Sequence, residues 1–281
     1  MTFRTIGSSI SDEQASSFGS APLRYAALGA LLLGISAFCH PVLGAPINYG
    51  TFMGSTVTYV DVTEDSNSGD SLPLFGAPTV SGDTLDFNPV GFSASASGAA
   101  GNDITDGNLS FMVVAKPGKA INLLSLNEGG DTTLAGFGTN ATFTKVTGTG
   151  VLNINAVDGV GIGAVSVPFS MTFTPSGGDY GLVTDFGGGP GGTIAWSGGT
   201  SFNLNSILTA NSIPFVGGAT KISINLDNTL TALSQAGTFS LIAKKDFGGL
   251  SITVNVPEPT TLLLASLAIS GLFVSRRRGA F

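Results

Sequence analysis

The densest group of potential metal ligands in the sequence lies between Asn102 and Asn108. The run Asn-Asp-Ile-Thr-Asp-Gly-Asn carries carboxylates at Asp103 and Asp106, with amide oxygens at both ends. Oxygen ligands of this kind suit Ca²⁺, although the spacing does not match the EF-hand loop. Asx turns that separate two strands would have the same composition. We therefore predict either a calcium site at Asp103 and Asp106 or a solvated turn, and no other cofactor.

Three residue types that carry much of enzyme chemistry are missing from the central part of the chain. The sole cysteine and the sole histidine are Cys39 and His40, and the arginines are Arg4, Arg24, Arg276, Arg277 and Arg278. Residues 45–257 therefore offer no cysteine nucleophile, no Ser-His-Asp triad and no His or Cys ligands for zinc, copper or haem. They also cannot form a disulfide bond, even in an oxidising compartment.

The charge of residues 45–257 further limits the classes of function that the protein could have. Six lysines stand against fifteen acidic residues, which gives a formal net charge of −9. The absence of a basic surface argues against a nucleic-acid partner. A pair of carboxylates, as in glycoside hydrolases, is the catalytic arrangement that this composition leaves open. Because any fifteen acids contain some pair, we predict that the protein is not an enzyme and keep a carbohydrate-active hydrolase as the alternative.

The segments that must position these side chains are predicted to be β-strands. Polar and apolar residues alternate in stretches rich in Val, Ile, Thr and Phe, a pattern typical of half-buried strands. The longest stretch has one apolar face with Ile222, Ile224, Leu226, Leu230 and Ala232. The predicted strands are Thr56–Val62, Leu109–Ala115, Ala120–Leu126, Ala141–Val146, Val151–Val157, Val165–Phe173, Lys221–Ala232, Phe239–Ala243 and Leu250–Val256.

Turns and one short helix are predicted between these strands. Polar and glycine-rich clusters predict turns at residues 65–70, 127–131 and 175–179, and apolar spacing predicts a helix over Asn203–Asn211. The glycine run at 187–192 contains a proline and precedes a strand, so it is a flexible loop rather than a dinucleotide fingerprint. Many short strands with regular turns predict an all-β fold: a single Gly-rich antiparallel β-sandwich or barrel-like domain over residues 45–255.

The aromatic residues favour core packing over ligand binding. There are 19 Phe against 4 Tyr and 1 Trp, whereas sugar-binding faces use rings with a polar edge. Phe143, Phe169 and Phe173 are expected to point inward. Trp196 with Tyr180 is the one candidate platform for a sugar.

Residues 1–44 have the organisation of an export signal. Arg4 and Arg24 precede an apolar stretch from Tyr25 to Phe38, which is short for a membrane span and suits a signal peptide. Small residues precede a cleavage point between Gly44 and Ala45. A lasting N-terminal membrane anchor is the alternative.

The last 26 residues, 256–281, have three elements in order. Pro257-Glu258-Pro259 is followed by an apolar run to Val274 and then by Arg276, Arg277 and Arg278. The apolar run is too short for a relaxed span, and the arginines should stay on the cytoplasmic side and stop transfer. A short C-terminal transmembrane helix would hold an exported protein in the cytoplasmic membrane, either as an intermediate or as a lasting anchor.

This C-terminus resembles the PEP-CTERM sorting signal of exported bacterial proteins. The resemblance implies that Pro257, Glu258 and Pro259 form the motif read by an exosortase, an integral-membrane cysteine transpeptidase. It also implies a stop-transfer role for Arg276 to Arg278, processing at the cell envelope and, commonly, a bacterium that makes exopolysaccharide. It implies nothing about the activity of residues 45–255.

The combined prediction is an exported, non-catalytic protein of the cell surface or the exopolysaccharide matrix. Its expected partners are an exosortase, the cytoplasmic membrane through the C-terminal helix, and extracellular polysaccharide. A calcium-stabilised adhesin is kept beside the hydrolase as an alternative.

Overall fold

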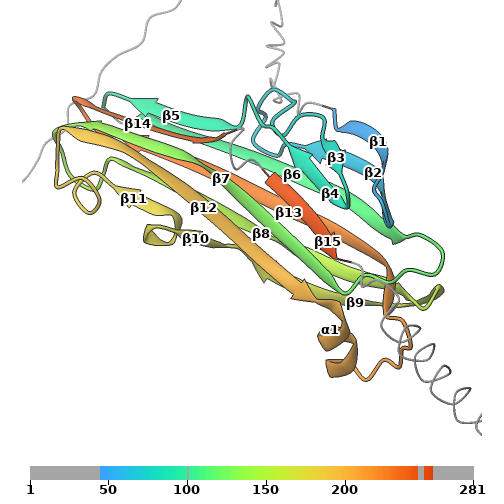
Figure 1. Ribbon diagram of the computed structural model, residues 1–281. Helices are drawn as coiled ribbons and strands as arrows, with labels where there is room; N and C mark the ends of the chain where they lie inside the picture. Colours follow the sequence, from blue (N-terminus) through green and yellow to red (C-terminus); the bar gives the residue numbers. More distant parts are fainter. Residues whose placement is uncertain (1–44, 100, 246–249, 256–281) are drawn as a thin grey trace, which may run out of the picture. The chain divides into compact units, whose positions relative to one another are not determined.

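The structure is a computed structural model, and it describes residues 45–99, 101–245 and 250–255 (Figure 1). The predicted signal peptide, residues 1–44, including the N-terminal signal helix that its apolar stretch is expected to form, and the predicted C-terminal transmembrane helix lie outside these residues. Within the described ranges, no helix combines the length and the hydrophobicity needed to cross a membrane.

Two antiparallel β-sheets pack face to face, as the alternating patterns predicted. The seven-stranded sheet has the order β1-β2-β6-β13-β8-β11, with β9 also paired to β8. Its strands are β1 (Ile47–Met53), β2 (Val57–Asp65), β6 (Gly101–Ala115), β8 (Phe143–Val157), β9 (Val160–Ser170), β11 (Asp179–Gly181) and β13 (Ala219–Ser234).

The eight-stranded sheet is centred on β7, which spans Leu123–Gly136. Its order is β10-β12-β7-β15-β4-β3, and β14 pairs with both β5 and β7. On one side of β7, residues 123–127 pair with β15 and residues 130–136 pair with β14. The other strands are β3 (Thr79–Ser81), β4 (Thr84–Phe87), β5 (Ser93–Ser97), β10 (Thr172–Thr174), β12 (Gly191–Asn203), β14 (Thr238–Lys244) and β15 (Leu250–Asn255).

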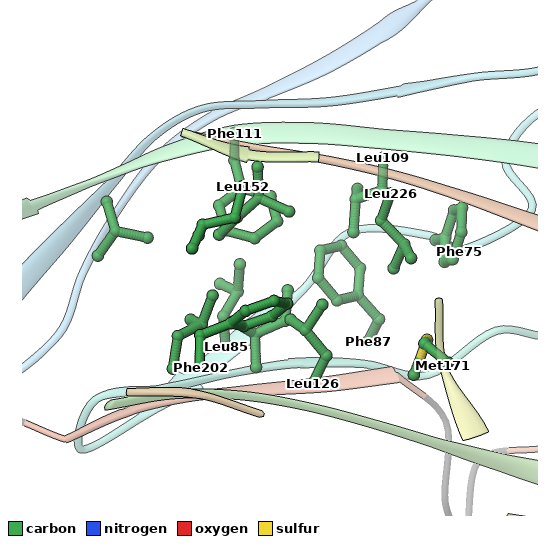
Figure 2. Packing of buried hydrophobic residues seen from close by; sticks show 14 of the residues in the cluster. Phe75, Leu85, Phe87, Leu109, Phe111, Leu126, Leu152, Met171, Phe202 and Leu226 are labelled. Atoms are coloured by element: carbon green, nitrogen blue, oxygen red, sulfur yellow. The ribbon is translucent and has the colours of Figure 1, made fainter. Parts of the chain in front are cut away.

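The hydrophobic core lies between the two sheets. Figure 2 shows Leu109, Phe111, Leu152 and Leu226 of the seven-stranded sheet facing Leu85, Phe87, Leu126 and Phe202 of the eight-stranded sheet. Phe75 and Met171, which lie in connecting segments, fill the space between them. The alternation of buried and less buried residues along β13 confirms the predicted apolar face.

One short α-helix, α1 (Leu204–Ala210), follows β12 where the sequence predicts it. It begins there because the Asn203 side chain accepts a hydrogen bond from the Ser206 backbone N–H at 3.0 Å, which caps the first turn. Leu204 and Leu208 then pack into the core. A 3₁₀ turn, η1 (Ser176–Gly178), occupies the predicted turn at 175–179.

Two predicted turns are wrong, because both segments are the interiors of strands. Residues 102–108 belong to β6 and residues 127–131 belong to β7. Their turn-like composition has a packing cause. At Gly107 a Cβ would lie 2.8 Å from the Phe92 ring. At Gly130 a Cβ would clash first with the backbone carbonyl oxygen of Ala243 on β14 and would lie 2.6 Å from the Trp196 ring. Gly107 thus leaves room for an aromatic ring, and Gly130 leaves room for both the β14 backbone and a ring.

Candidate functional site: a buried polar cluster between the sheets

Three inward-facing strand positions carry polar side chains that meet one another between the sheets. Glu128 lies on β7, Asn228 on β13 and Lys244 at the end of β14. Their exposed fractions are 3%, 0% and 3%. Lysine and glutamate are almost never this buried unless they are paired. The position of Asn228 follows from strand alternation, since it continues the face of Leu226 and Leu230.

The three side chains form a closed triangle of contacts, which we call the buried cluster. Lys244 Nζ makes an ion pair with Glu128 Oε2 and donates a hydrogen bond to Asn228 Oδ1 at 3.0 Å. Asn228 Nδ2 donates to Glu128 Oε1 at 3.1 Å and lies 3.3 Å from the Thr147 carbonyl oxygen. Each member therefore contacts both of the others.

Aromatic rings and small residues surround the buried cluster. Lys244 Nζ lies 5.7, 5.2 and 5.9 Å from the ring centroids of Phe75, Phe92 and Trp196. At Gly148 on β8, a Cβ would lie 2.7 Å from Asn228 Nδ2. Burial lowers the pKa of the Lys244 ammonium, and the neighbouring Glu128 carboxylate offsets this only in part.

The arrangement unites a nucleophile, an acyl group and a proton-transfer group outside bulk water. A neutral lysine amine is a nucleophile, a carboxamide carbon is an electrophile, and a carboxyl group in contact with both nitrogens can move protons between them. Together these three groups have the chemical potential for a covalent step.

The structure does not bring the predicted calcium ligands together. Asp103 and Asp106 are three residues apart on β6, so their side chains point to opposite faces of the strand. Asp103 Oδ2 accepts a hydrogen bond from the Ser95 backbone N–H at 2.8 Å, whereas Asp106 Oδ2 accepts one from Thr229 Oγ1 at 3.0 Å. Within the described ranges, no group of three or more Asp, Glu, His or Cys residues could hold a metal ion. Calcium binding at Asp103 and Asp106 stays a prediction.

One pair of acids does lie close together, on the outer face of the seven-stranded sheet. Burial, followed by a hydrogen bond to Asp106 and the negative charge of Asp106, raises the pKa of Asp227 to about 6. Two carboxyl groups in direct hydrogen-bonding contact are closer than the roughly 5–9.5 Å that glycoside hydrolases use. The three surface hollows that we describe hold at most one acid each, Asp61 in one and Asp179 in another.

The proposed aromatic platform is wrong, because both rings are inside the protein. Tyr180 is 0% and Trp196 is 3% exposed. The Trp196 ring packs edge-on against Phe173, at 6.0 Å between centroids. Of the phenylalanines expected to point inward, Phe173 is buried and Phe169 packs partly buried against the core, whereas Phe143 does not belong to it.

The residues of the two terminal signals fall largely outside the described part of the chain. Gly44, the Pro257–Pro259 motif and the Arg276–Arg278 cluster lie outside it, and Ala45 is its exposed first residue. The roles predicted for these residues therefore rest on the sequence and not on the structure.

Comparison with known proteins identifies the C-terminal segment. Residues 255–278 match the PEP-CTERM protein-sorting motif. The chain carries a PEP-CTERM sorting signal. It is therefore an exported protein of the kind that exosortases process at the cell envelope, as the resemblance implied. Apart from Asn255, the last residue of β15, the PEP-CTERM match lies outside the sandwich, and no curated protein matches the chain.

Solved structures add nothing to this assignment. The chain is similar to a loop-swap mutant of Xyn11A from Neocallimastix patriciarum, with 8% identity, a TM-score of 0.19, and coverage of 73% of this chain and 94% of that one. The family 11 xylanase from Neocallimastix patriciarum gives 9% identity, a TM-score of 0.20, and coverage of 75% and 99%. TM-scores this low support no argument about this chain.

Sequence reasoning missed the buried cluster. It assigned Glu128 to a turn and did not consider Asn228 or Lys244. One signal was present: Asn228 interrupts the apolar face between Leu226 and Leu230. A polar side chain at such a position requires a buried partner.

Proposed function

We propose that the sandwich is a non-catalytic domain displayed at the cell surface or in the exopolysaccharide matrix. The observation that supports this most directly is how its acidic side chains are used. Asp158 accepts hydrogen bonds from three consecutive backbone N–H groups, Val216, Gly217 and Gly218, at 2.7, 2.7 and 2.9 Å. These bonds lower the pKa of Asp158, the one from Val216 most strongly.

Other carboxylates likewise accept hydrogen bonds from backbone N–H groups of other segments. Asp83 accepts hydrogen bonds from the Thr56 and Val57 backbone N–H groups at 2.7 and 3.2 Å. Glu64 accepts them from the backbone of the segment 74–76. Acids used in this way are structural rather than catalytic, because their oxygens are already occupied by donors of the protein.

The outer faces of the sheets suit a hydrated, sugar-rich surrounding. Neutral polar side chains pair across neighbouring strands there: Asn108 with Asn225 at 3.0 Å and Thr133 Oγ1 with Thr193 Oγ1 at 2.9 Å. Such pairs stabilise the sheet and present hydroxyl and amide groups that can hydrogen-bond to polysaccharide. Few charges are involved, in keeping with a chain in which charged residues make up 10%.

The proposal is tested in two steps on the full chain in a bacterium that contains an exosortase. First, the intact mass of the protein from the envelope fraction and the medium is measured, with Glu258→Ala as the sorting variant and Thr260→Ala as the matched control. We expect a product that starts near Ala45 and ends near Pro257, and retention of the tail in Glu258→Ala only. A wild-type mass that still includes Arg276–Phe281 would make the tail a lasting anchor.

Second, the released protein is incubated with the polysaccharide of the same bacterium. We expect it to co-sediment with the polysaccharide and to produce no new reducing ends. Release of reducing ends that Asp106→Asn or Asp227→Asn abolishes would establish the hydrolase instead. Co-sedimentation that depends on added Ca²⁺ and is lost in EDTA would establish the calcium-dependent adhesin.

A further inference from the structure

The buried cluster links the two sheets. Lys244 lies on β14 of the eight-stranded sheet and Asn228 lies on β13 of the seven-stranded sheet, yet Nζ and Oδ1 are 3.0 Å apart. Glu128 on β7 is in hydrogen-bonding contact with the side-chain nitrogens of both, Lys244 Nζ and Asn228 Nδ2. The consecutive strands β13 and β14 and the distant strand β7 therefore fix an asparagine, a lysine and a glutamate against one another.

Burial disfavours the charged form of the Lys244 side chain. The side chains of Lys244 and Glu128 are fully buried, with an exposed fraction of 0% for each. Keeping an ammonium and a carboxylate here is costly, because an ion pair seldom recovers the whole free energy of dehydration. Transfer of one proton from Lys244 to Glu128 removes both charges and leaves a free amine beside the Asn228 carboxamide.

We propose that Lys244 Nζ and Asn228 Cγ become joined by an intramolecular isopeptide bond, formed by the protein itself with Glu128 as the catalytic residue. The inference stands on the buried cluster and is independent of the proposed function. Such a bond would give an exported sandwich a covalent cross-link between its sheets. Residues 45–257 contain no cysteine that could supply a disulfide for this purpose.

The step balances without an oxidant or a co-reactant. The neutral Lys244 amine attacks Asn228 Cγ, and the new Nζ–Cγ bond forms as the carbonyl opens to a tetrahedral intermediate. Glu128 gives its proton to Nδ2 and takes one from Nζ, using the two oxygens that contact these nitrogens. The Cγ–Nδ2 bond breaks, ammonia leaves, and a secondary amide and a neutral Glu128 carboxylic acid remain.

Fixed geometry explains how an unreactive amide is attacked at all. Groups held in contact in one orientation react as if at effective concentrations of roughly 10⁵–10⁸ M. Proton transfer by a positioned carboxyl group adds a factor of about 10²–10⁴. The product has no charge between the sheets, so the cost of burying two ions disappears when the bond forms.

The experiment is peptide mapping of the wild-type full chain after purification and denaturation. The chain has no Lys or Arg between Lys221 and Lys244, so trypsin releases 222–244 from an unlinked protein. In the linked protein Lys244 is blocked, and we expect 222–245 instead, lighter than its sequence by about 17 Da, the mass of ammonia. Chymotrypsin cleaves after Phe239, and we expect the peptides carrying Asn228 and Lys244 to stay joined.

Variants separate the roles of the three residues. Glu128→Gln keeps the shape of the side chain and removes its acid–base function, so we expect the mass loss to disappear or to be slowed at least 100-fold. Lys244→Met and Asn228→Ala remove the reacting groups and should give the full mass. Lys245→Met is the matched control at the adjacent, exposed lysine and should retain the loss.

The wild-type map alone can overturn the proposal, so it does not depend on any variant folding. Full-mass peptides, with release of 222–244 by trypsin and separate chymotryptic peptides, would show that the bond does not form. A mass loss that persists unchanged in Glu128→Gln would overturn the role of Glu128. A mass loss that persists in Lys244→Met would place the cross-link elsewhere and overturn the assignment.

Discussion

Asp227 and Asn228 are consecutive residues of β13 whose side chains point to opposite faces of the seven-stranded sheet. Asp227 lies on the outer face beside Asp106, whereas Asn228 lies between the sheets in contact with Glu128 and Lys244. Strand alternation thus separates the outer pair of acids from the buried cluster by one residue in the chain. The two groups can be tested independently.

The pH dependence of stability should carry a contribution from Asp227. Its pKa of about 6 in the folded protein lies above the ordinary value of 3.8. The folded state therefore binds this proton more tightly than the unfolded chain. Consequently the Asp227 contribution to the unfolding free energy grows as the pH falls through about 6 and levels off near 3.8.

Asp227→Asn should remove this contribution and stabilise the protein at pH 7. Urea unfolding of wild type and variant, measured at intervals from about pH 4 to about pH 7, gives the difference directly. We expect the two curves to converge as the pH falls. Asp61→Asn, which removes an exposed carboxylate, is the matched control. A parallel curve for Asp227→Asn would contradict the assigned pKa.

Glu64 should be important for stability, because it holds a buried segment. Its side chain is 0% exposed. It accepts hydrogen bonds from Tyr49 Oη at 2.6 Å and from the Phe75 and Gly76 backbone N–H groups at 2.8 and 3.2 Å. Glu64→Gln turns one oxygen into a donor, so a buried N–H loses its acceptor. We expect a loss of about 1–3 kcal/mol in urea unfolding; a change no larger than that of Asp61→Asn would contradict it.

Gly107 should tolerate no side chain, in contrast to Gly161. A Cβ at Gly107 would lie 2.8 Å from the Phe92 ring and 2.9 Å from the Phe75 ring. A Cβ at Gly161 would have no neighbouring atom within 4 Å. Both glycines lie on strands. Gly107→Ala should cost about 1–3 kcal/mol through overpacking, and Gly161→Ala should be near neutral. Equal thermal unfolding temperatures for the two variants would show that the rings move aside without cost.

The sequence predicts the positions of the strands better than it predicts the side-chain contacts between the two sheets. Period-2 patterns locate most strands and the sandwich, because burial of one face requires that alternation. They fail at 102–108 and 127–131, where glycine and acidic residues have the composition of turns. Gly107 instead makes room for the Phe92 ring, and Gly130 makes room for the Ala243 backbone and the Trp196 ring. That relationship depends on contacts between distant segments, which a local pattern does not contain.

The buried cluster was missed for the same reason. Glu128, Asn228 and Lys244 belong to three strands, and only the register of two sheets brings them together. Asn228 alone carries a local signal, because it interrupts an apolar face. The sorting signal is the opposite case. Its three elements, from Pro257 to Arg278, are contiguous in the chain, so the sequence alone identifies it and residues 255–278 match the known motif.

The last prediction concerns the charge left behind when Lys244 is removed. Lys244→Met should be less stable than Glu128→Gln/Lys244→Met, by up to about 3–5 kcal/mol, because Glu128 in the single variant is a buried carboxylate without a cation.

Glu128→Gln/Lys244→Met removes that charge and keeps the hydrogen bond to Asn228, so it should be the more stable of the two variants. Neither variant has the amine, so neither can form the isopeptide bond, and the difference between them measures burial of charge alone. Urea unfolding at pH 7 of both variants, with Lys245→Met as the control, gives this difference. A double variant that is no more stable than the single one would contradict this prediction.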